Sequence, residues 1–469
     1  MKRPFFFFAI SIIIVFRAMC QPQELLTDSI SKQLRIGVEG FKERYHSPSI
    51  VVAVVHEKDI IFSEALGYMD VEKKTPTSID AKYPIQSLTK VFTATMLMQL
   101  VQKGVVTLGD NVKKYVAEFK DDFKVPGNSG TTLLQLATHT SGLPRNSPAD
   151  IQFTKQIDRW FFATRNEPII EGATTKEFLR SLAFINKEYP EYQLLSYGDR
   201  HYSNLGYSLL GIALERAAKV NYTDYIINNI CRPLDMHNSG FYSESSRKTN
   251  VVAKGYYYRD STKDFIAVPE FKPNSIMPAG GMYASARDLA KFISFQFETN
   301  TGMANNVLSE ENRAMMRVFN IAWRPSYPFV FHEGSMLGYR CEMALNSDLK
   351  IGWVILTNTT DFDFSRMNRY IGDLVMPLFS KTPVTDLQKF AGIYKLDGDY
   401  DSLRIYLKDG NLYSTYLHDV IPDVPLSSAG DNKFKGLGKG SYVIGYEFIP
   451  DDKGEIKFLN MGQLMWVKQ

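Results

Sequence analysis

A serine followed three residues later by a lysine opens the most apolar stretch of the chain. Ser87 and Lys90 precede the run 91–101, which Lys103-Gly104 follows. Read as a helix, the run is apolar on every side, so it is predicted to lie in a core and to end at the glycine. Ser87 is then at the N-terminal tip of a buried helix, with Lys90 one turn along the same face. A hydroxyl beside an amine can be a nucleophile next to its proton acceptor.

The same spacing has an ordinary explanation. The S-x-x-K pattern recurs in polar stretches or beside a turn, at Ser29/Lys32, Ser245/Lys248 and Ser347/Lys350. A serine at the start of a helix can also be a simple N-cap. Ser87 differs from the other three serines because a continuous apolar helix follows it. The pattern alone therefore leaves both a nucleophile and an N-cap open.

Three other segments carry polar side chains with chemical potential. Tyr202 and Asn204 stand two positions apart before a long apolar helix, so their side chains can point the same way. A packing tyrosine and a capping asparagine are the alternative. His139 ends an apolar helix and is interpreted as a hydrogen-bonded structural histidine rather than a catalytic one. The segment 329–335, which contains His332, reads as a strand.

Composition excludes several classes of protein. The chain has 469 residues, of which 44% are hydrophobic and 22% charged, and its net charge is +3. These values are typical of a globular protein with two or three domains and do not indicate disorder. No long basic run points to nucleic acid. No Cys/His spacing resembles a zinc site, so neither a metal nor a cofactor is expected.

The first twenty residues have the pattern of a secretory signal peptide. Lys2-Arg3 is followed by an apolar segment over 5–16 and by small residues around Ala18 and Cys20. The apolar segment is short for a membrane span, which needs about 20 residues. Residues 1–20 are therefore predicted to be a signal peptide of an exported, periplasmic or secreted protein without a transmembrane span in the mature chain. Lipid modification of Cys20 is the disfavoured alternative, because Arg17 and Met19 are bulky for such a site.

The cysteine count allows either a disulfide or two free thiols in the mature chain. With Cys20 removed, Cys231 and Cys341 remain, one at a helix end and one in a strand. A disulfide between them is open, but two buried thiols are the favoured prediction.

The order of the elements predicts an α/β (α+β) domain. A β-branched hairpin over 49–67 and a second hairpin over 339–358 bracket a largely helical stretch. A sheet whose first and last strands come from opposite ends of the sequence explains this order. We predict a domain over 24–380 with an antiparallel sheet flanked by helices and a helical subdomain. Pro383 marks a boundary, after which short alternating strands predict a small all-β domain over 385–469, of barrel or sandwich type and without an evident helix.

Three motifs and their flanking segments now stand in one order. The motifs are Ser87-x-x-Lys90, Tyr202-x-Asn204 and His332-x-Gly334. Together they resemble the serine β-lactamase and penicillin-binding-protein superfamily, over about residues 25–380. The similarity is greatest to its class C-like branch of β-lactamase-related serine hydrolases, which contains D,D-peptidases, D-aminopeptidases and esterases. The region 385–469 resembles the small lipocalin-like domains appended to such hydrolases.

The resemblance implies a role for each matching residue. Ser87 is similar to the acylated nucleophile, Lys90 to its partner in proton transfer and Tyr202 to the tyrosine that shares the acid/base work. Asn204 is similar to the residue that orients the lysine and the substrate amide. The remaining matches, His332, Gly334 and Ser335, fall on the substrate-binding strand. The backbone N–H groups of Ser87 and Ser335 would form the oxyanion hole.

One departure from the family pattern affects the expected substrate. β-Lactamases and penicillin-binding proteins usually carry Lys-Thr-Gly or Lys-Ser-Gly on this strand, and here it is His332-Glu333-Gly334. A neutral histidine does not favour a substrate carboxylate, and Glu333 could repel one. We therefore expect an ester, amide or D-amino-acid peptide substrate, possibly cell-wall derived, rather than efficient β-lactam hydrolysis. The alternatives are a true β-lactamase or D,D-peptidase, and a non-hydrolytic protein that binds cell-wall fragments on the same fold.

Overall fold

A seven-stranded antiparallel sheet forms the centre of the larger part of the chain, in the order β11-β12-β13-β14-β1-β2-β3. Its strands are β1 (Ser49–His56), β2 (Asp59–Asp70), β3 (Thr75–Pro76), β11 (Arg324–Ser326), β12 (Phe329–Met336), β13 (Tyr339–Asn346) and β14 (Ile351–Thr357). The computed structural model describes residues 26–119, 130–163, 169–185, 202–241, 252–298, 307–326, 328–379, 384–396, 402–408, 410–416, 424–430, 432–437, 443–461 and 464–469. The predicted signal peptide lies outside these residues.

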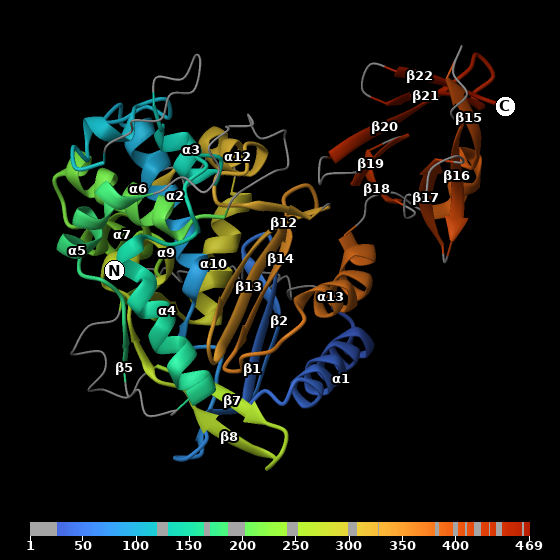
Figure 1. The fold of residues 1–469 in the computed structure, drawn as a ribbon. Coiled ribbons are helices and arrows are strands. Elements are labelled where there is room, and N and C mark those ends of the chain that lie inside the picture. Colours follow the sequence, from blue (N-terminus) through green and yellow to red (C-terminus); the bar gives the residue numbers. More distant parts are fainter. Residues whose placement is uncertain are drawn as a thin grey trace, which may run out of the picture.

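The two ends of this region meet in the sheet, as the sequence predicted. Strand β1 pairs with β14, in a register that places Ala53 opposite Val354. Both strands are rich in β-branched residues and are buried almost throughout, because helices cover both faces of the sheet. Figure 1 shows α1 (Asp28–Arg44) and α13 (Phe364–Phe379) on one face and α10 (Ala286–Phe297) on the other.

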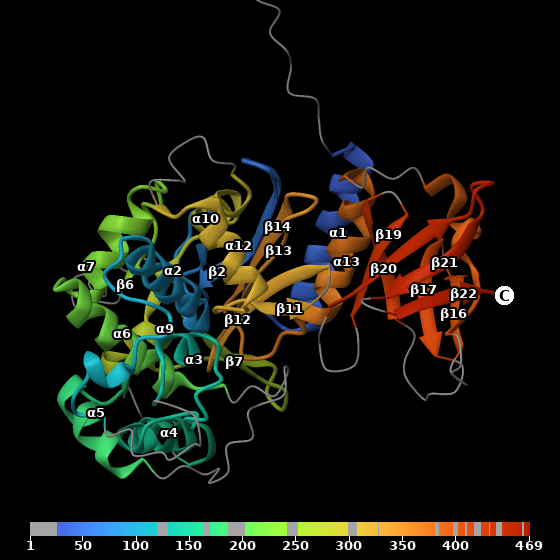
Figure 2. The same ribbon diagram turned by 90° about the horizontal axis from the view of Figure 1, so that it is seen from above.

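The remaining helices and small strands form a helical region beyond α10 (Figure 2). Its α-helices are α2 (Thr89–Gln102), α3 (Leu133–Ala137), α4 (Ile151–Asp158), α5 (Thr175–Ser181), α6 (Asn204–Ala218), α7 (Tyr222–Ile226), α9 (Met277–Gly280) and α12 (Glu310–Val318). Its short strands are β4 (Tyr83–Pro84), β5 (Ile169–Glu171), β6 (Gly240–Phe241), β9 (Glu270–Lys272) and β10 (Met282–Ala284). The hairpin of β7 (Tyr256–Arg259) and β8 (Asp264–Ala267) lies instead at the end of the central sheet, where Tyr256 bridges to Thr359 (Figure 1). Single turns of 3-10 helix lie at Gln86–Leu88, Val112–Lys114, Pro148–Asp150, Leu182–Phe184 and Asn274–Ile276, and π-helical turns at Arg159–Ala163 and Ile227–Cys231.

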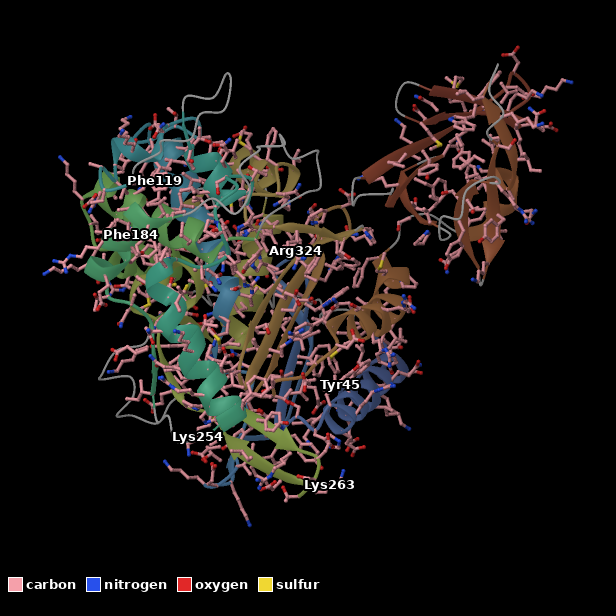
Figure 3. All side chains as sticks on the ribbon, in the orientation of Figure 1. Tyr45, Phe119, Phe184, Lys254, Lys263 and Arg324 are labelled. Carbon is pink, nitrogen blue, oxygen red and sulfur yellow. The ribbon has the colours of Figure 1, made fainter. Side chains whose placement is uncertain are left out.

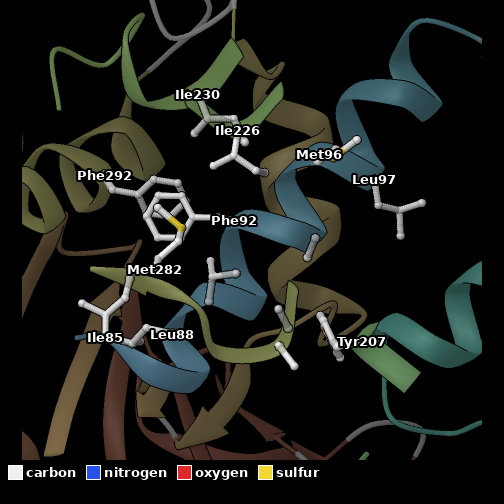
Figure 4. Packing of buried hydrophobic residues seen from close by; sticks show 14 of the residues in the cluster. Ile85, Leu88, Phe92, Met96, Leu97, Tyr207, Ile226, Ile230, Met282 and Phe292 are labelled. Atoms are coloured by element: carbon white, nitrogen blue, oxygen red, sulfur yellow. The ribbon is translucent and has the colours of Figure 1, made fainter. Parts of the chain in front are cut away.

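Helix α2 lies at the centre of this region. Residues 89–100 are all buried, because α6, α7, α9 and α12 pack around the helix. Figure 4 shows apolar side chains of neighbouring elements, among them Phe292 and Ile226, surrounding Phe92 and Met96. The helix ends at Lys103, and Gly104 follows with a φ of +68°. The prediction of a helix that is buried on every side is confirmed.

Strands after residue 390 close into an eight-stranded antiparallel barrel. They are β15 (Gly392–Leu396), β16 (Ser402–Lys408), β17 (Asn411–Tyr416), β18 (Val424–Gly430), β19 (Lys433–Leu437), β20 (Val443–Pro450), β21 (Ile456–Met461) and β22 (Leu464–Lys468). The prediction of an all-β unit is confirmed, but a 3-10 helix at Val384–Phe390 precedes the strands, and Phe390 packs against Phe434 and Phe448. In both views the barrel lies beyond α13 (Figures 1 and 2). The exact boundary near Pro383 stays a prediction.

Two further expectations concern thiols and membranes. Cys231 and Cys341 are free and buried, which confirms two buried thiols rather than a disulfide. Among the residues that the structure describes, no helix has the length and apolarity that crossing a bilayer requires.

The sheet also buries a carboxylic acid. Glu342 on β13 is 2% exposed, and it lies opposite Glu333 on β12. Burial is the main reason that its pKa rises to about 8, although a hydrogen bond with Asn368 of α13 opposes the rise. The fold therefore favours the protonated acid, whereas an unfolded glutamate has a pKa of about 4.3.

This burial makes stability depend on pH. Because the folded pKa is raised, the contribution of Glu342 is fully present below about pH 4 and is lost as the pH rises through about 8. Urea unfolding should show the free energy of unfolding of the wild type falling by about 2–4 kcal/mol between pH 5 and pH 9 relative to Glu342→Gln. Glu57→Gln, at an exposed pair with Lys350, is the control and should keep the wild-type slope. Equal slopes for wild type and Glu342→Gln would contradict the expectation.

Candidate active site

Ser87 lies in a single 3-10 turn that leads directly into α2. The residue before it, Gln86, is buried and has a φ of +47°, a conformation that side chains other than glycine seldom adopt. Such strain persists only where the surrounding structure imposes it. The backbone N–H groups at this tip belong to the first turn, which has no acceptors within its own helix. Ser87 is thus held rigidly at the start of a buried helix, as the sequence predicted.

The Lys90 side chain is fully buried beneath Ser87. Its Nζ lies 3.0 Å from Ser87 Oγ, 2.9 Å from Asn204 Oδ1 and 2.7 Å from the carbonyl oxygen of Ala279. Burial lowers the pKa of Lys90 well below its usual value, and the positive charge of Arg145 lowers it further. Two of the three partners are oxygens that only accept. A neutral amine that donates to both of them keeps its lone pair for Ser87.

Tyr202 approaches Ser87 from the other chain segment that the sequence indicated. Its phenol donates to Ser87 Oγ over 2.7 Å. Burial raises the pKa of Tyr202 to about 12, so the phenol is protonated at neutral pH, although the bond to Ser87 and the charge of Arg145 oppose the rise. The serine hydroxyl therefore has an amine on one side and a neutral phenol on the other.

Asn204 does not cap the helix that it begins. The N-cap of α6 is Ser203, whose hydroxyl accepts from the N–H of Gly206 over 2.8 Å. The Asn204 amide instead donates to Asn146 Oδ1 over 3.0 Å, and this orientation turns its oxygen toward Lys90. The structure thus excludes the simple capping role that the sequence left open for Asn204.

A loop over residues 138–146 holds the Tyr202–Asn204 segment in place. His139 Nδ1 accepts from the N–H of Ser203 over 3.1 Å, and its ring lies 4.4 Å from the Tyr202 ring. The Arg145 guanidinium lies 5.1 Å from the same ring, and the Arg145 carbonyl accepts from the N–H of Asn204 over 2.7 Å. His139 is therefore hydrogen-bonded as a positioning residue, in agreement with its predicted structural role.

Strand β12 brings its glycine against the backbone that precedes Ser87. A Cβ on Gly334 would lie 2.3 Å from the carbonyl oxygen of Ile85. Among the described residues, β11 pairs only with the beginning of β12, at 329–331. From residue 332 onward, the edge of β12 on the β11 side therefore has no neighbouring strand within the described part of the chain, whereas its other edge pairs with β13. This is the stretch that contains His332, Gly334 and Ser335.

His332 is buried on this strand, with 1% of its surface exposed. Its Nδ1–H donates to the carbonyl oxygen of Ala322. The pKa of His332 falls to about 3, mainly because the ring is buried and in second place because Lys90 is nearby. The ring is therefore a neutral group close to Lys90. The side chain of Ser335 accepts from Arg340 over 2.9 Å, so only its backbone is available to the Ser87 side.

Glu333 does not line the Ser87 side of the strand. Side chains along a strand point to alternate faces of the sheet, so Glu333 projects from the face opposite to that of its neighbours His332 and Gly334. On that face it lies across from Glu342, whose hydrogen bond with Asn368 shows that α13 covers this side. Arg324, labelled in Figure 3, lies 3.1 Å from it, and Arg340 lies 3.8 Å from it. The expectation that Glu333 repels a carboxylate stays a prediction: its carboxylate pairs with Arg324, but its charge still contributes to raising the pKa of Tyr202.

The structure brings Ser87, Lys90, Tyr202 and Asn204 into one hydrogen-bonded cluster, with His332 and Gly334 beside it. Sequence reasoning missed Arg145, Asn146 and the Ala279 carbonyl. Arg145 and Asn146 come shortly after His139 in the sequence, and their polar character was the available signal. Among the described residues, no cluster of His, Cys, Asp and Glu could hold a metal ion.

Comparison with known proteins identifies a family and a fold. The family model described as Beta-lactamase matches residues 37–376. Protein flp of Staphylococcus aureus (strain MRSA252) is 28% identical over 342 residues, and the match covers 71% of this chain but only 64% of that relative. The chain therefore spans less than two thirds of the length of this relative.

Two solved structures share the fold. The octameric penicillin-binding protein homologue from Pyrococcus abyssi has a TM-score of 0.61 and 24% identity, covering 94% of this chain and 100% of that one. A class C beta lactamase from Rhodobacter sphaeroides has a TM-score of 0.57 and 19% identity, covering 75% and 100%. The predicted fold class is confirmed.

The contact between β12 and the Ser87 turn can be tested with a methyl group. Gly334→Ala should lower the free energy of unfolding by about 1–3 kcal/mol, because the new Cβ meets the fixed Ile85 carbonyl. It should also slow the covalent labelling of Ser87 by a fluorophosphonate, measured by mass spectrometry. The control is Gly40→Ala on α1, where no heavy atom lies within 4 Å of the new Cβ. This change should stabilise by about 0.5–1 kcal/mol. Indistinguishable behaviour of the two variants would contradict the close contact.

Proposed function

The chain belongs to the Beta-lactamase family, and on that premise we propose that it is a serine hydrolase that acts through an acyl-enzyme on an ester, amide or peptide bond. The observation that carries the proposal is the position of Ser87 Oγ, 3.0 Å from the Lys90 amine and 2.7 Å from the Tyr202 phenol. A serine hydroxyl is nearly inert without such a base. Burial of a lysine beside a serine is costly, and a protein that only binds its ligand does not need this arrangement.

The proton route follows from the protonation states. Neutral Lys90 donates to Asn204 Oδ1 and to the Ala279 carbonyl, and its lone pair accepts the proton of Ser87 as the oxygen attacks the substrate carbonyl. Tyr202 is protonated at neutral pH and donates to the same oxygen. As the tetrahedral intermediate collapses, Tyr202 gives its proton to the leaving group, and the proton that Lys90 took from Ser87 replaces it, since Lys90 Nζ lies 4.8 Å from the centre of the Tyr202 ring. Water then cleaves the acyl-enzyme, with the same two groups next to the ester.

Stabilisation of the oxyanion is assigned to the backbone. The N–H of Ser87 lies in the first turn before α2, where a helix attracts negative charge. We place the second donor at the N–H of Ser335, on the edge of β12 that β11 leaves uncovered. The close approach of Gly334 to the Ile85 carbonyl supports this pairing, because it holds the strand against the nucleophile turn.

Neutral His332 supports esters or peptides over β-lactams as substrates. With a pKa of about 3, it adds no positive charge to the substrate strand at neutral pH, whereas the lysine usual at this place in β-lactamases does. Small-molecule or peptide substrates agree with the family. Export of the protein, with removal of residues 1–20, is proposed on the sequence pattern alone.

A substrate panel tests the proposal. Purified protein should hydrolyse members of a set of p-nitrophenyl esters, D-amino acid amides and D-Ala-D-Ala peptides faster than nitrocefin. Ser87→Ala should lower kcat/KM by about 10³-fold or more. Ser347→Ala, in the exposed S-x-x-K pattern of Ser347 and Lys350, is the matched control and should keep the full rate. Fast nitrocefin turnover that is lost in Ser87→Ala would overturn the substrate preference. Absence of labelling at Ser87 by a fluorophosphonate would overturn the enzyme assignment.

The pH profile tests Lys90 as the base. Because burial and Arg145 lower the pKa of Lys90, kcat/KM for a neutral ester should rise with pH through a limb well below the usual lysine value of about 10.4. Arg145→Gln removes one of the two causes and should move this limb to higher pH, and Arg145→Lys should restore it. A limb that is the same in wild type and Arg145→Gln would speak against Lys90 as the titrating group.

A further inference from the structure

Arg145 is a positive charge beside the nucleophile that the reaction itself does not use. Its guanidinium lies 5.1 Å from the centre of the Tyr202 ring, and its side chain is exposed. It is close enough to Lys90 and Tyr202 to influence both groups electrostatically. Tyr202 in turn donates to Ser87 Oγ. The guanidinium therefore flanks the position at which a substrate must bind.

Nothing described in the structure balances this charge. Among the described residues, no carboxylate lies within 4.0 Å of Arg145, whereas Arg324 pairs with Glu333 at 3.1 Å and Arg216 with Glu118 at 2.8 Å. His332 and Tyr202 are neutral at neutral pH, and the carboxylate that influences Tyr202, Glu333, is already paired with Arg324 at 3.1 Å. An exposed guanidinium in neutral surroundings is well suited to bind a carboxylate through two parallel hydrogen bonds.

The backbone of Arg145 is fixed relative to the nucleophile. Its carbonyl oxygen accepts from the N–H groups of Asn204 and Leu205 over 2.7 and 3.2 Å. The next residue, Asn146, accepts from the Asn204 side chain. The segment that orients Lys90 thus also fixes the point from which the Arg145 side chain extends. A carboxylate that binds Arg145 is placed at a set distance from Ser87, which is the requirement for selecting a substrate.

We propose that Arg145 is the specificity-determining residue of this site and binds a carboxylate carried by the ester or peptide substrate. The inference rests on the proposed serine hydrolase function and names its substrate class. β-Lactamases usually carry the positive charge as a lysine on this strand, where this chain has the neutral His332. In this assignment Arg145, in the loop over residues 138–146, supplies the charge instead. Arg145 binds the substrate in this assignment and takes no part in proton transfer.

Two boronic acids that differ by one carboxylate test the inference without turnover. Phenylboronic acid and 3-carboxyphenylboronic acid each form a tetrahedral adduct with a nucleophilic serine and so imitate the acyl-transfer intermediate. Calorimetry with the full chain should show the carboxylated compound binding about tenfold more tightly, less so at high salt. Arg145→Gln should remove this preference, read as the ratio of the two affinities at one pH, because an effect of Arg145 on Lys90 or Tyr202 changes both affinities alike. Arg145→Lys should keep part of the preference.

Arg216→Gln is the control, because the Arg216 guanidinium pairs with Glu118 over 2.8 Å and is not among the charges that act on Lys90, Tyr202 or His332. It should retain the preference. Equal affinity of the wild type for both compounds overturns the inference but leaves the serine hydrolase proposal intact, since phenylboronic acid still binds Ser87. An equal loss for both compounds in Arg145→Gln overturns it as well, because Arg145 then only supports Tyr202. Binding of neither compound to wild type contradicts the serine hydrolase proposal, and the inference fails with it.

Discussion

Burial of an amine is the constraint on which the site depends. A charged lysine is costly to bury, so the fold either pairs it with a carboxylate or keeps it neutral. Lys90 meets an amide oxygen, a backbone carbonyl and a serine hydroxyl. These partners satisfy its hydrogen bonds without supplying negative charge. Burial without a carboxylate partner lowers the pKa of Lys90 and so favours its neutral form, whereas a nearby carboxylate would have favoured the ammonium in an ordinary ion pair.

The elements that enclose Lys90 come from four parts of the chain. Helix α2 carries it, the start of α6 supplies Asn204, α9 supplies the Ala279 carbonyl, and the loop over residues 138–146 fixes the tyrosine and the asparagine. The central sheet adds β12, whose glycine touches the turn before the nucleophile. Packing around an entirely buried helix therefore does two things at once. It stabilises the helical region, and it sets the distances among groups that are far apart in sequence.

The charges near the site are separated by the alternation of the strand. His332 and Gly334 lie on the side of β12 that meets the helical region, whereas Glu333 and Ser335 interact with Arg324 and Arg340. Arg324 is therefore paired, whereas no carboxylate among the described residues lies within 4.0 Å of Arg145. The barrel after residue 390 has its own core, built around Phe390, Phe434 and Phe448, and one ion pair at 2.9 Å joins Lys435 to Asp348 of the larger region.

The sequence by itself determined the buried helix, the serine at its tip, the antiparallel sheet and the strand-rich end of the chain. These features follow from local apolar patterns and short motifs, which adjacent residues specify. Only the tertiary structure decided that Ser203 rather than Asn204 caps α6, that Glu333 faces away from Ser87, and that Arg145 lies against Tyr202. The Ser203 cap and the pairing of Glu333 with Arg324 are local contacts, and they depend on which face of an element turns inward. The position of Arg145 beside Tyr202 and the direction of the Asn204 side chain depend on contacts between segments more than fifty positions apart. Side-chain direction across such distances is set by packing, and no local pattern encodes it.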